Sequence, residues 1–320
     1  MNRLRLVNFQ KVKSANSKAQ VGLLLNQGPN PFVVNLRAKE FSGEFDGKFD
    51  MVDLYNDHDN KIMSAIRKVA SRINDEGSFA SKPYILPLDP SKVKLLPPVT
   101  PVRNIICIGK NYSDHIAEVK KRDEKDGTAT PASAPQYPMF FTKATTTVIG
   151  PHTPVPSHNT LTKWLDYEAE LAVVIGKGGV NISVENAMQH VFGYTCANDV
   201  SARDLQRRHG QFFKGKTLDG TCPLGPCVVP ASDVDPNDLS IRLWLNGELK
   251  QNSRTSKMIF NIPAIIASLS EGFTLLPGDV ILTGTPDGVA YAANPPFSLK
   301  SGDDMTVEIE HIGRLDNKVI

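Results

Sequence analysis

The feature that most constrains this 320-residue chain is a single segment, Trp164 to Gly176, in which acidic residues lead into an unbroken apolar run. Side chains of a β-strand alternate between two faces, so Asp166, Glu168 and Glu170 would share one face. The run that follows, Ala172 to Ile175, is apolar at every position, as in strands that are buried on both faces. The segment therefore predicts carboxylates carried on a strand that enters the interior of a domain.

Carboxylates that enter a core cannot stay charged and unpaired, and a hard divalent cation is the simplest compensation. An oxygen-only ligand set favours Mg²⁺, Mn²⁺ or Ca²⁺ over zinc. A third acid, Asp199, follows another strand-like run, Val191 to Ala197. Two alternatives stay open: the acidic face can belong to a solvated edge strand, and Asp199, with Ser201 and Asp204 close behind it, can begin a helix.

The chain length suits two units. The first 80 residues contain short strand-like runs and one helix-like stretch, Lys61 to Ile73, which indicates a small α+β unit. Prolines lack a backbone donor, so we expect no regular structure where six of them crowd together. These are Pro83, Pro87, Pro90, Pro97, Pro98 and Pro101. We expect an accessory N-terminal domain with a Pro-rich linker at residues 1–98 and a catalytic domain at residues 99–320.

Short apolar strands alternate with turn residues in the second unit. The strand-like runs are residues 104–109, 171–176, 227–230, 241–245, 279–283 and 305–310. Helices are expected only in limited segments, such as Ser183 to Val191 and Asn261 to Ser270. The pattern predicts a strand-dominated α+β protein whose larger domain is a mixed β-roll or sandwich.

The charge balance excludes some partners. With 36 basic and 34 acidic residues the formal net charge is +2, which favours neither nucleic acid nor a membrane surface. Apolar runs are far shorter than the roughly 20 residues that cross a bilayer. A small-molecule partner is therefore expected.

Four cysteines without a CxxC pair indicate neither a disulfide framework nor a zinc ribbon, so a reducing, cytoplasmic location fits. No acid precedes Glu40, whereas Arg3, Arg5, Lys11 and other basic residues do. Such a start is typical either of a basic strand or of a targeting segment, which leaves a mitochondrial location as the alternative.

A histidine follows the strand-like run at residues 104–109. A helix beginning near Ser113 would place His115 and Glu118 one turn apart on one face. A carboxylate beside an imidazole orients it and raises its basicity, as a general base requires. A surface ion pair accounts for the same spacing.

Gly210 to Thr217 matches the phosphate-loop pattern GxxxxGK[ST] at every fixed position. That mechanism requires a buried strand before the loop and a helix after it. Here a charged segment, Arg203 to His209, precedes the match, and Gly220 and Pro223 would break the following helix. Nucleotide binding is disfavoured, and it remains a rival class together with a non-catalytic metal-binding module.

The ordered motifs together resemble the fumarylacetoacetate hydrolase family, and they span residues 104 to 286. The matching segments are Ile108–His115, Pro138–Lys143, Asp166–Gly176, Asn198–Gln206, Gly215–Thr217, Cys222–Pro226 and Leu282–Pro286. The resemblance implies a strand-rich roll that is usually a homodimer. One departure is the long polar stretch between His115 and Pro138, which leaves lid closure and substrate size open.

The resemblance also implies roles for individual residues. The implied metal ligands are Glu168, Glu170 and Asp199; the catalytic residues are His115, Glu118 and Lys216; the substrate-binding residues are Gln206, Thr285 and Lys143. His115 and Glu118 would form an acid/base pair on a lid. Lys216 would stabilise negative charge on the substrate.

The two-domain branch of this family, which the chain resembles, implies oxaloacetate keto-enol tautomerase activity with Mg²⁺, or with Mn²⁺ or Ca²⁺, as cofactor. Sister branches leave alternatives open: hydrolysis of a C–C bond in acylpyruvates or fumarylpyruvate, decarboxylation of oxaloacetate, and isomerisation of 2-hydroxydienoates. All of these reactions pass through an enolate of a 2-oxo acid that a metal ion stabilises.

Overall fold

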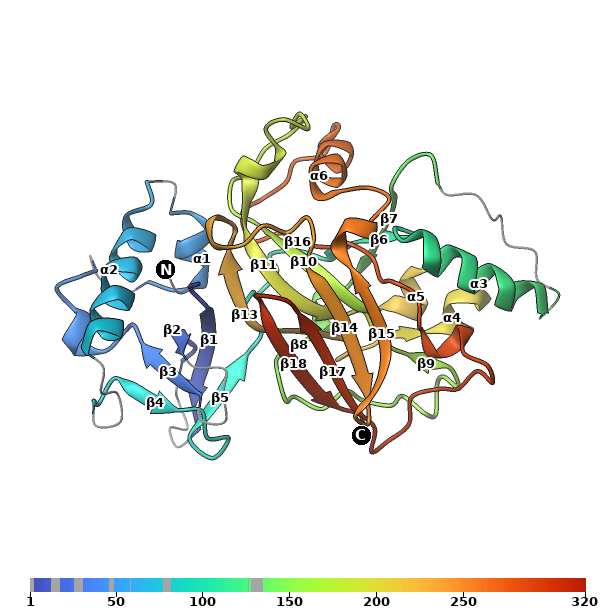
Figure 1. Cartoon of the computed structure of the whole chain (residues 1–320), viewed down its shortest axis with the longest axis horizontal. Coiled ribbons are helices and arrows are strands. Elements are labelled where there is room, and N and C mark those ends of the chain that lie inside the picture. The colour runs from blue at the N-terminus through green and yellow to red at the C-terminus, as the bar shows by residue number, and fades with distance from the viewer. Residues whose placement is uncertain are drawn as a thin grey trace.

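The computed structural model describes residues 3–12, 18–25, 31–45, 49–57, 59–76, 82–125, 127 and 135–320. Strands dominate, and the expected α+β class is confirmed. Two sheets face each other in the larger part of the molecule, while the N-terminal segments form a smaller lobe at one side (Figure 1).

The larger sheet runs through both parts, in the order β4-β3-β2-β1-β13-β11-β10-β16-β6-β7, with β5 beside β1 and β8 beside β13. Its strands are β1 Leu6–Lys11, β2 Gln20–Leu25, β3 Phe32–Asn35, β4 Ile85–Pro87, β5 Val93–Leu96, β6 Ile105–Gly109, β7 Met139–Lys143, β8 Val148–Ile149, β10 Ala169–Ile175, β11 Val191–Asn198, β13 Cys222–Pro230 and β16 Val280–Leu282. All seven residues of β10 and all nine of β13 are buried, as expected for central strands.

The smaller sheet, in the order β15-β14-β17-β18, covers β10, β11 and β13 and encloses a continuous apolar core (Figure 1). Its strands are β14 Ser240–Leu245, β15 Glu248–Arg254, β17 Asp304–Ile309 and β18 Gly313–Lys318. A short pair, β9 Leu165–Asp166 with β12 Ser201–Ala202, lies apart from both sheets. The arrangement agrees with the expected β-roll or sandwich.

Six α-helices occur among the described residues: α1 Met51–Tyr55, α2 Lys61–Glu76, α3 Ser113–Lys125, α4 Arg203–Arg208, α5 Phe213–Lys216 and α6 Ile262–Ser270. Helix α6 confirms a prediction, and the Asn261 side chain caps it by accepting a hydrogen bond from Ala264 N.

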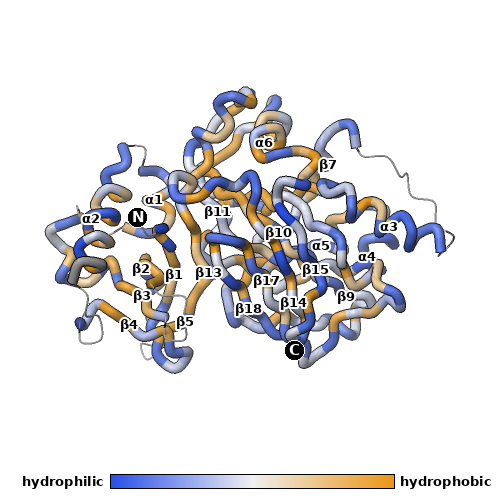
Figure 2. The backbone as a smooth tube through the Cα atoms, in the orientation of Figure 1, coloured by the Kyte–Doolittle hydropathy of each residue, from blue (hydrophilic) through white to orange (hydrophobic). Residues whose placement is uncertain are grey.

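Hydropathy follows the layers: the strands facing the core are largely apolar, whereas the outer half of α3 is polar (Figure 2). No helix in the described part of the chain is long and apolar enough to cross a membrane.

The expected helix at residues 183–191 is wrong. Only a short 3₁₀ helix, Ala187–His190, forms there, and Val191 already begins β11. Val191 pairs with Ile175 of β10 and so belongs to the sheet and not to a helix. Tertiary pairing therefore overrides the local helical pattern.

The expectation that the Pro-rich region lacks regular structure is also wrong, since β4 and β5 both lie within it. Pro87 ends β4, an edge strand, where a missing donor costs little. The proline-free run Val93–Leu96 pairs with β1. One apolar cluster extends from the N-terminal lobe to Ala172 and Val174 of β10, so the boundary near residue 99 stays a prediction.

The continuous acidic strand is broken. β9 ends at Asp166 and β10 begins at Ala169, so Tyr167 and Glu168 lie between two strands. Of the polar stretch between His115 and Pro138, residues up to Lys125 complete α3, and residues 126 and 128–134 lie outside the described part.

Candidate metal centre and active-site cavity

Three carboxylates meet where β10 and β11 run side by side. Pairing of Ala169 with Asn198 places Asp199, the residue after β11, against Glu168, and Asp199 N donates a hydrogen bond to Glu168 O at 2.9 Å. One oxygen each from Glu168, Glu170 and Asp199 lies within 4.8 Å of the others, and all three side chains are buried. The structure therefore brings the predicted metal ligands together.

Two buried lysines contact this carboxylate triad. Lys216, in α5, donates hydrogen bonds of 2.7 Å to both Glu168 Oε2 and Asp199 Oδ2. Lys143, at the end of β7, lies 2.8 Å from Asp199 Oδ1 but directs its hydrogen bond to Val200 O. Asp199 Oδ1 accepts no well-oriented hydrogen bond among the described residues.

The neighbouring glutamates differ electrostatically. Burial disfavours the charge of Glu168, but the cations Lys216 and Arg203 outweigh it and lower its pKa. Within the described part of the chain, the Glu170 carboxylate accepts a hydrogen bond only from a backbone donor, Gly284 N, at 2.6 Å. Burial, together with the charges of the other two carboxylates, raises the pKa of Glu170 well above its usual range.

These observations fit a hard divalent cation. The donors of the triad are all carboxylate oxygens, and one oxygen of Asp199 lacks a good hydrogen bond. Two lysines contact Glu168 or Asp199, and Arg203 is shared between Glu168 and Asp166, so no cationic side chain contacts Glu170 among the described residues. A buried acid such as Glu170, whose charge the protein compensates poorly, is a natural ligand. Glu168, Glu170 and Asp199 would hold such an ion.

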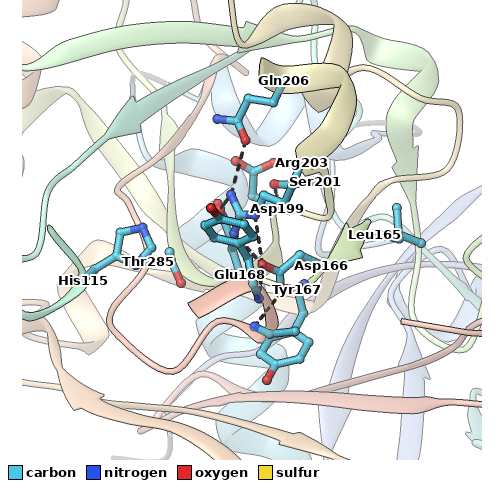
Figure 3. Close-up of polar contacts among 12 residues, drawn as sticks. His115, Leu165, Asp166, Tyr167, Glu168, Asp199, Ser201, Arg203, Gln206 and Thr285 are labelled. Atoms are coloured by element: carbon cyan, nitrogen blue, oxygen red, sulfur yellow. Dashed lines mark hydrogen bonds and ion pairs between the residues drawn. The ribbon is translucent and has the colours of Figure 1, made fainter. Parts of the chain in front are cut away.

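Glu168 and Glu170 of the triad line a cavity of about 300 Å³, whose wall also includes residues of helix α3. The predicted site residues on its wall are His115, Glu168, Glu170, Gln206, Lys216 and Thr285. Asp199, Glu118 and Lys143 do not line it. His115 and Thr285 both line the cavity, and Figure 3 shows them on one side of the cluster around Glu168 and Asp199.

His115 and Glu118 are close without being hydrogen bonded. Nδ1 of His115 is 3.9 Å from Oε2 of Glu118, too long for a hydrogen bond. Both oxygens of Glu118 instead accept from Gly288 N, at 3.0 and 3.1 Å. The His115 Nδ1 atom is buried and has no partner among the described residues. The expected acid/base pair is thus adjacent but not assembled.

The other predicted substrate residues occupy different places. Thr285 Oγ1 accepts a 2.9 Å hydrogen bond from Gln251, which fixes its orientation in the cavity wall. Gln206, in α4, accepts from Arg203 at 3.4 Å (Figure 3). Lys143 is fully buried behind Asp199, where it can orient that ligand but does not reach the cavity.

Sequence reasoning missed Arg203 as a functional residue. Its guanidinium contacts Asp166 Oδ2 at 2.8 Å and Glu168 Oε1 at 2.6 Å, so it fixes the second of these carboxylates (Figure 3). Asp166, far from joining the metal ligands, also accepts from the backbone of Ala290 and Tyr291. The available signal was the position of Arg203 inside a matched motif, three residues before Gln206.

The phosphate-loop match is structurally excluded. The helix that carries Lys216 has only four residues, and the Lys216 ammonium is buried between two carboxylates. A Cβ on Gly215 would lie 2.5 Å from Gln206 N, so the two backbones touch where phosphates would need room. Nucleotide binding at this loop is therefore ruled out on geometry.

A buried carboxylate triad beside a lysine, opening into a small cavity with a histidine on its wall, defines an enzyme site for a small molecule. Residues 104–320 match the family model described as fumarylacetoacetate (FAA) hydrolase C-terminal. The chain therefore belongs to the fumarylacetoacetate hydrolase family, and the expected family, fold type and enzyme class are confirmed.

Relatives and solved structures agree with this assignment. Oxaloacetate tautomerase YisK of Bacillus subtilis (strain 168) is 50% identical over 253 residues, covering 78% of this chain and 79% of the relative. Oxaloacetate tautomerase fahd2, mitochondrial, of Xenopus laevis is 38% identical over 322 residues, covering 99% and 90%. The structure of a fumarylacetoacetate hydrolase from Exiguobacterium antarcticum superposes with a TM-score of 0.73 at 35% identity, covering 99% of both chains.

Proposed function

We propose that this enzyme catalyses the keto-enol tautomerisation of oxaloacetate with a divalent cation, Mg²⁺ in the first instance, held by the carboxylate triad. Two relatives named as oxaloacetate tautomerases, at 50% and 38% identity, support the substrate. The cavity of about 300 Å³ suits a small acid. When bound, the cation would act as a Lewis acid toward the oxygens of a 2-oxo acid.

Lys216 stabilises the negative charge that develops on the substrate oxygen during enolisation. Lys216 lines the cavity, and its ammonium is held by Glu168 and Asp199, so little reorganisation is needed when charge appears. Arg203 holds Glu168 from the other side and keeps that carboxylate in place. The side chains of Lys216 and Arg203 are therefore both in position before substrate enters.

His115 moves the proton at C3 of the substrate. His115 lies on the cavity wall, and its buried Nδ1 atom has no hydrogen-bond partner among the described residues. An imidazole nitrogen can both accept a proton and return it, as a general acid/base requires.

The observation that carries the choice of reaction is the separation of His115 from Glu118. Hydrolysis of a C–C bond needs a water activated by a base that a third group orients. Here the distance is 3.9 Å, and the Glu118 carboxylate is bound to Gly288 N. Proton transfer at carbon needs only the imidazole in the cavity, so the geometry favours tautomerisation.

The test follows oxaloacetate enol absorbance and acetylpyruvate cleavage in parallel on wild type and His115→Ala. We expect tautomerisation to fall by less than about 10²-fold and to recover partly with added imidazole, because buffer can replace a missing base. His209→Ala, an exposed histidine after α4, is the matched control. Efficient cleavage of acetylpyruvate by a wild type that leaves oxaloacetate at its uncatalysed rate would overturn the proposal in favour of a hydrolase.

A homodimer in a reducing, cytoplasmic setting completes the proposal. The four cysteines, Cys107, Cys196, Cys222 and Cys227, are free and buried, which fits a reducing compartment. The Xenopus laevis relative is named as mitochondrial, and that location is the alternative. Light scattering after size exclusion tests the dimer.

A further inference from the structure

Three side chains from three separate elements meet at the mouth of the cavity. Asp123 of α3 accepts hydrogen bonds from Arg207 of α4 and, at 2.9 Å, from the hydroxyl of Tyr291, which lies in the 3₁₀ helix Ala290–Ala292. Arg207 also contacts the Tyr291 hydroxyl, and its guanidinium stacks over that ring at 4.5 Å. All three residues line the same cavity as Glu168 and Glu170 of the carboxylate triad.

The exposure of these groups is unusual for a surface ion pair. Asp123 is only 5% exposed, although it lies on a helix whose mean character is strongly polar, whereas the Arg207 side chain is 44% exposed. A buried carboxylate is thus turned inward to meet an arginine at the opening. Ion pairs that are fully exposed contribute little to stability. A pair with one buried member is costly to break, so at a cavity wall it restricts which ligands can bind.

Arg207 is the next cation along α4 after Arg203. Arg203 is committed to the acidic cluster through Asp166 and Glu168. Residues four apart share a helix face and lie about 6 Å apart along the axis, so Arg207 is displaced from the triad toward the mouth. A carboxylate at the far end of a longer substrate would meet Arg207, and Asp123 already occupies it.

We propose that Asp123 is an internal carboxylate that sets the length of acid this site accepts. It pairs with Arg207 and thereby takes the position that the distal carboxylate of a longer substrate would occupy. The inference rests on the proposed function and names its substrate class: short 2-oxo diacids such as oxaloacetate. Each added carbon lengthens an extended chain by roughly 1.2 Å, so a seven-carbon diacid reaches about 3.6 Å further toward the mouth than oxaloacetate, roughly two-thirds of a helical turn. Such an acid must displace Asp123 to pair with Arg207.

The experiment compares two probes by titration calorimetry of the Mg²⁺-loaded protein. Oxalate is short enough to report only the triad end, and 2-oxopimelate, a seven-carbon 2-oxo diacid, also reaches the mouth. In Asp123→Asn we expect 2-oxopimelate to bind about tenfold more tightly, since a charge-assisted pair to Arg207 becomes available. Oxalate affinity should change by less than about twofold, well below the gain expected from a charge-assisted pair with Arg207.

Two further variants locate the effect. Asp114→Asn removes an exposed carboxylate from the same helix, which pairs with Lys257, and should leave both affinities unchanged. The double variant Asp123→Asn/Arg207→Gln should lose the gain for 2-oxopimelate, because the receiving guanidinium is gone. Retention of the gain in the double variant would show that Arg207 is not the receiver.

Equal shifts of oxalate and 2-oxopimelate in Asp123→Asn would overturn the length-setting role, since a contact that only anchors α3 affects both probes alike. If that variant does not fold, Tyr291→Phe removes one donor from Asp123 and should favour 2-oxopimelate in the same direction by a smaller factor; an unchanged affinity ratio is then the contrary result. Failure of the proposed function would appear separately, as a wild type that does not accelerate oxaloacetate tautomerisation.

Discussion

Lys216 and a divalent cation would compete for two of the same carboxylates. The ammonium binds Glu168 and Asp199, two of the three candidate ligands, at 2.7 Å each. Burial opposes the charge of Lys216, but the two carboxylates outweigh burial and raise its pKa, so it stays protonated. The same residue thus limits metal affinity and supplies positive charge for the reaction.

Lys216→Met should separate these two effects. We expect turnover of oxaloacetate to fall by about 10²- to 10³-fold, the usual loss for one charge-stabilising donor. Affinity for Mn²⁺ should stay equal or rise, since a like charge leaves the site. Steady-state rates and calorimetric Mn²⁺ titration measure both, with the exposed Lys214→Met as control. A parallel loss of Mn²⁺ binding would contradict the competition.

Glu170→Gln should also change two quantities in opposite directions. Without metal, an amide removes the cost of burying the poorly compensated charge of Glu170, so the chelator-treated variant should melt at a higher temperature than wild type. With metal, the variant should lose a ligand and most of the Mn²⁺-induced rise in melting temperature. Thermal unfolding with Mn²⁺ and with chelator tests this, against the exposed Glu185→Gln. A full Mn²⁺-induced rise in Glu170→Gln would remove that residue from the ligand set.

At the scale of elements, the site depends on how closely α4 packs against α5. Gly215 precedes Lys216 and lies so near α4 that an added Cβ would stand 2.5 to 2.6 Å from the backbone of Gln206. Glycine is required here by close approach of two backbones, since nothing flexible is available to move. The short helix α5 owes its position to this contact.

Gly215→Ala should therefore reduce catalysis far more than it reduces stability. Pushing α5 away from α4 would displace Lys216 from the carboxylates, and a displacement of about 1 Å can cost 10²-fold in rate. The rate with oxaloacetate and the urea midpoint measure the two effects. Gly43→Ala, whose Cβ would meet nothing within 4 Å, is the control. Wild-type activity in Gly215→Ala would show that the contact is loose.

Local sequence predicted the elements that depend on local pattern. The apolar run after Glu170 correctly indicated a central strand, whereas the grouping of Asp199 with Glu168 and Glu170 came from the family resemblance and not from local pattern. The break after Asp166 was not predictable, because it depends on Arg203, 37 positions further along the chain. Likewise β5 forms in a Pro-rich region only because β1 supplies its hydrogen-bond partners. Long-range partners, absent from any local window, decide these cases.

For the whole molecule, Asp233 joins the N-terminal lobe to the larger part. Its carboxylate accepts from Leu4 N at 2.9 Å and from Arg67 of α2 at 2.5 Å. Burial raises the pKa of Asp233, but these hydrogen bonds outweigh burial and lower it. The junction is therefore strongest when Asp233 is ionised.

Acid should weaken this junction in a defined direction. A folded-state pKa below the ordinary value of about 3.9 gives stability that is complete above that value and is lost as pH falls through the folded-state pKa. The difference in urea midpoint between wild type and Asp233→Asn should thus be present at pH 7 and shrink below about pH 4. Asp59→Asn, which removes an exposed pair with Lys61, should show no such difference. A pH-independent gap for Asp233→Asn would contradict this reading of the junction.

The first strand of the chain also has a consequence for synthesis. Leu6 of β1 pairs with Val228 of β13, and these residues leave the ribosome roughly 220 positions apart. At about 5–20 residues per second, β1 waits on the order of 10 to 45 seconds for this neighbour. β2 and β5 can pair with β1 much earlier, but its start keeps unpaired backbone groups until β13 emerges. The nascent chain therefore passes through a long interval in which a half-finished sheet edge is available to chaperones or to other nascent chains.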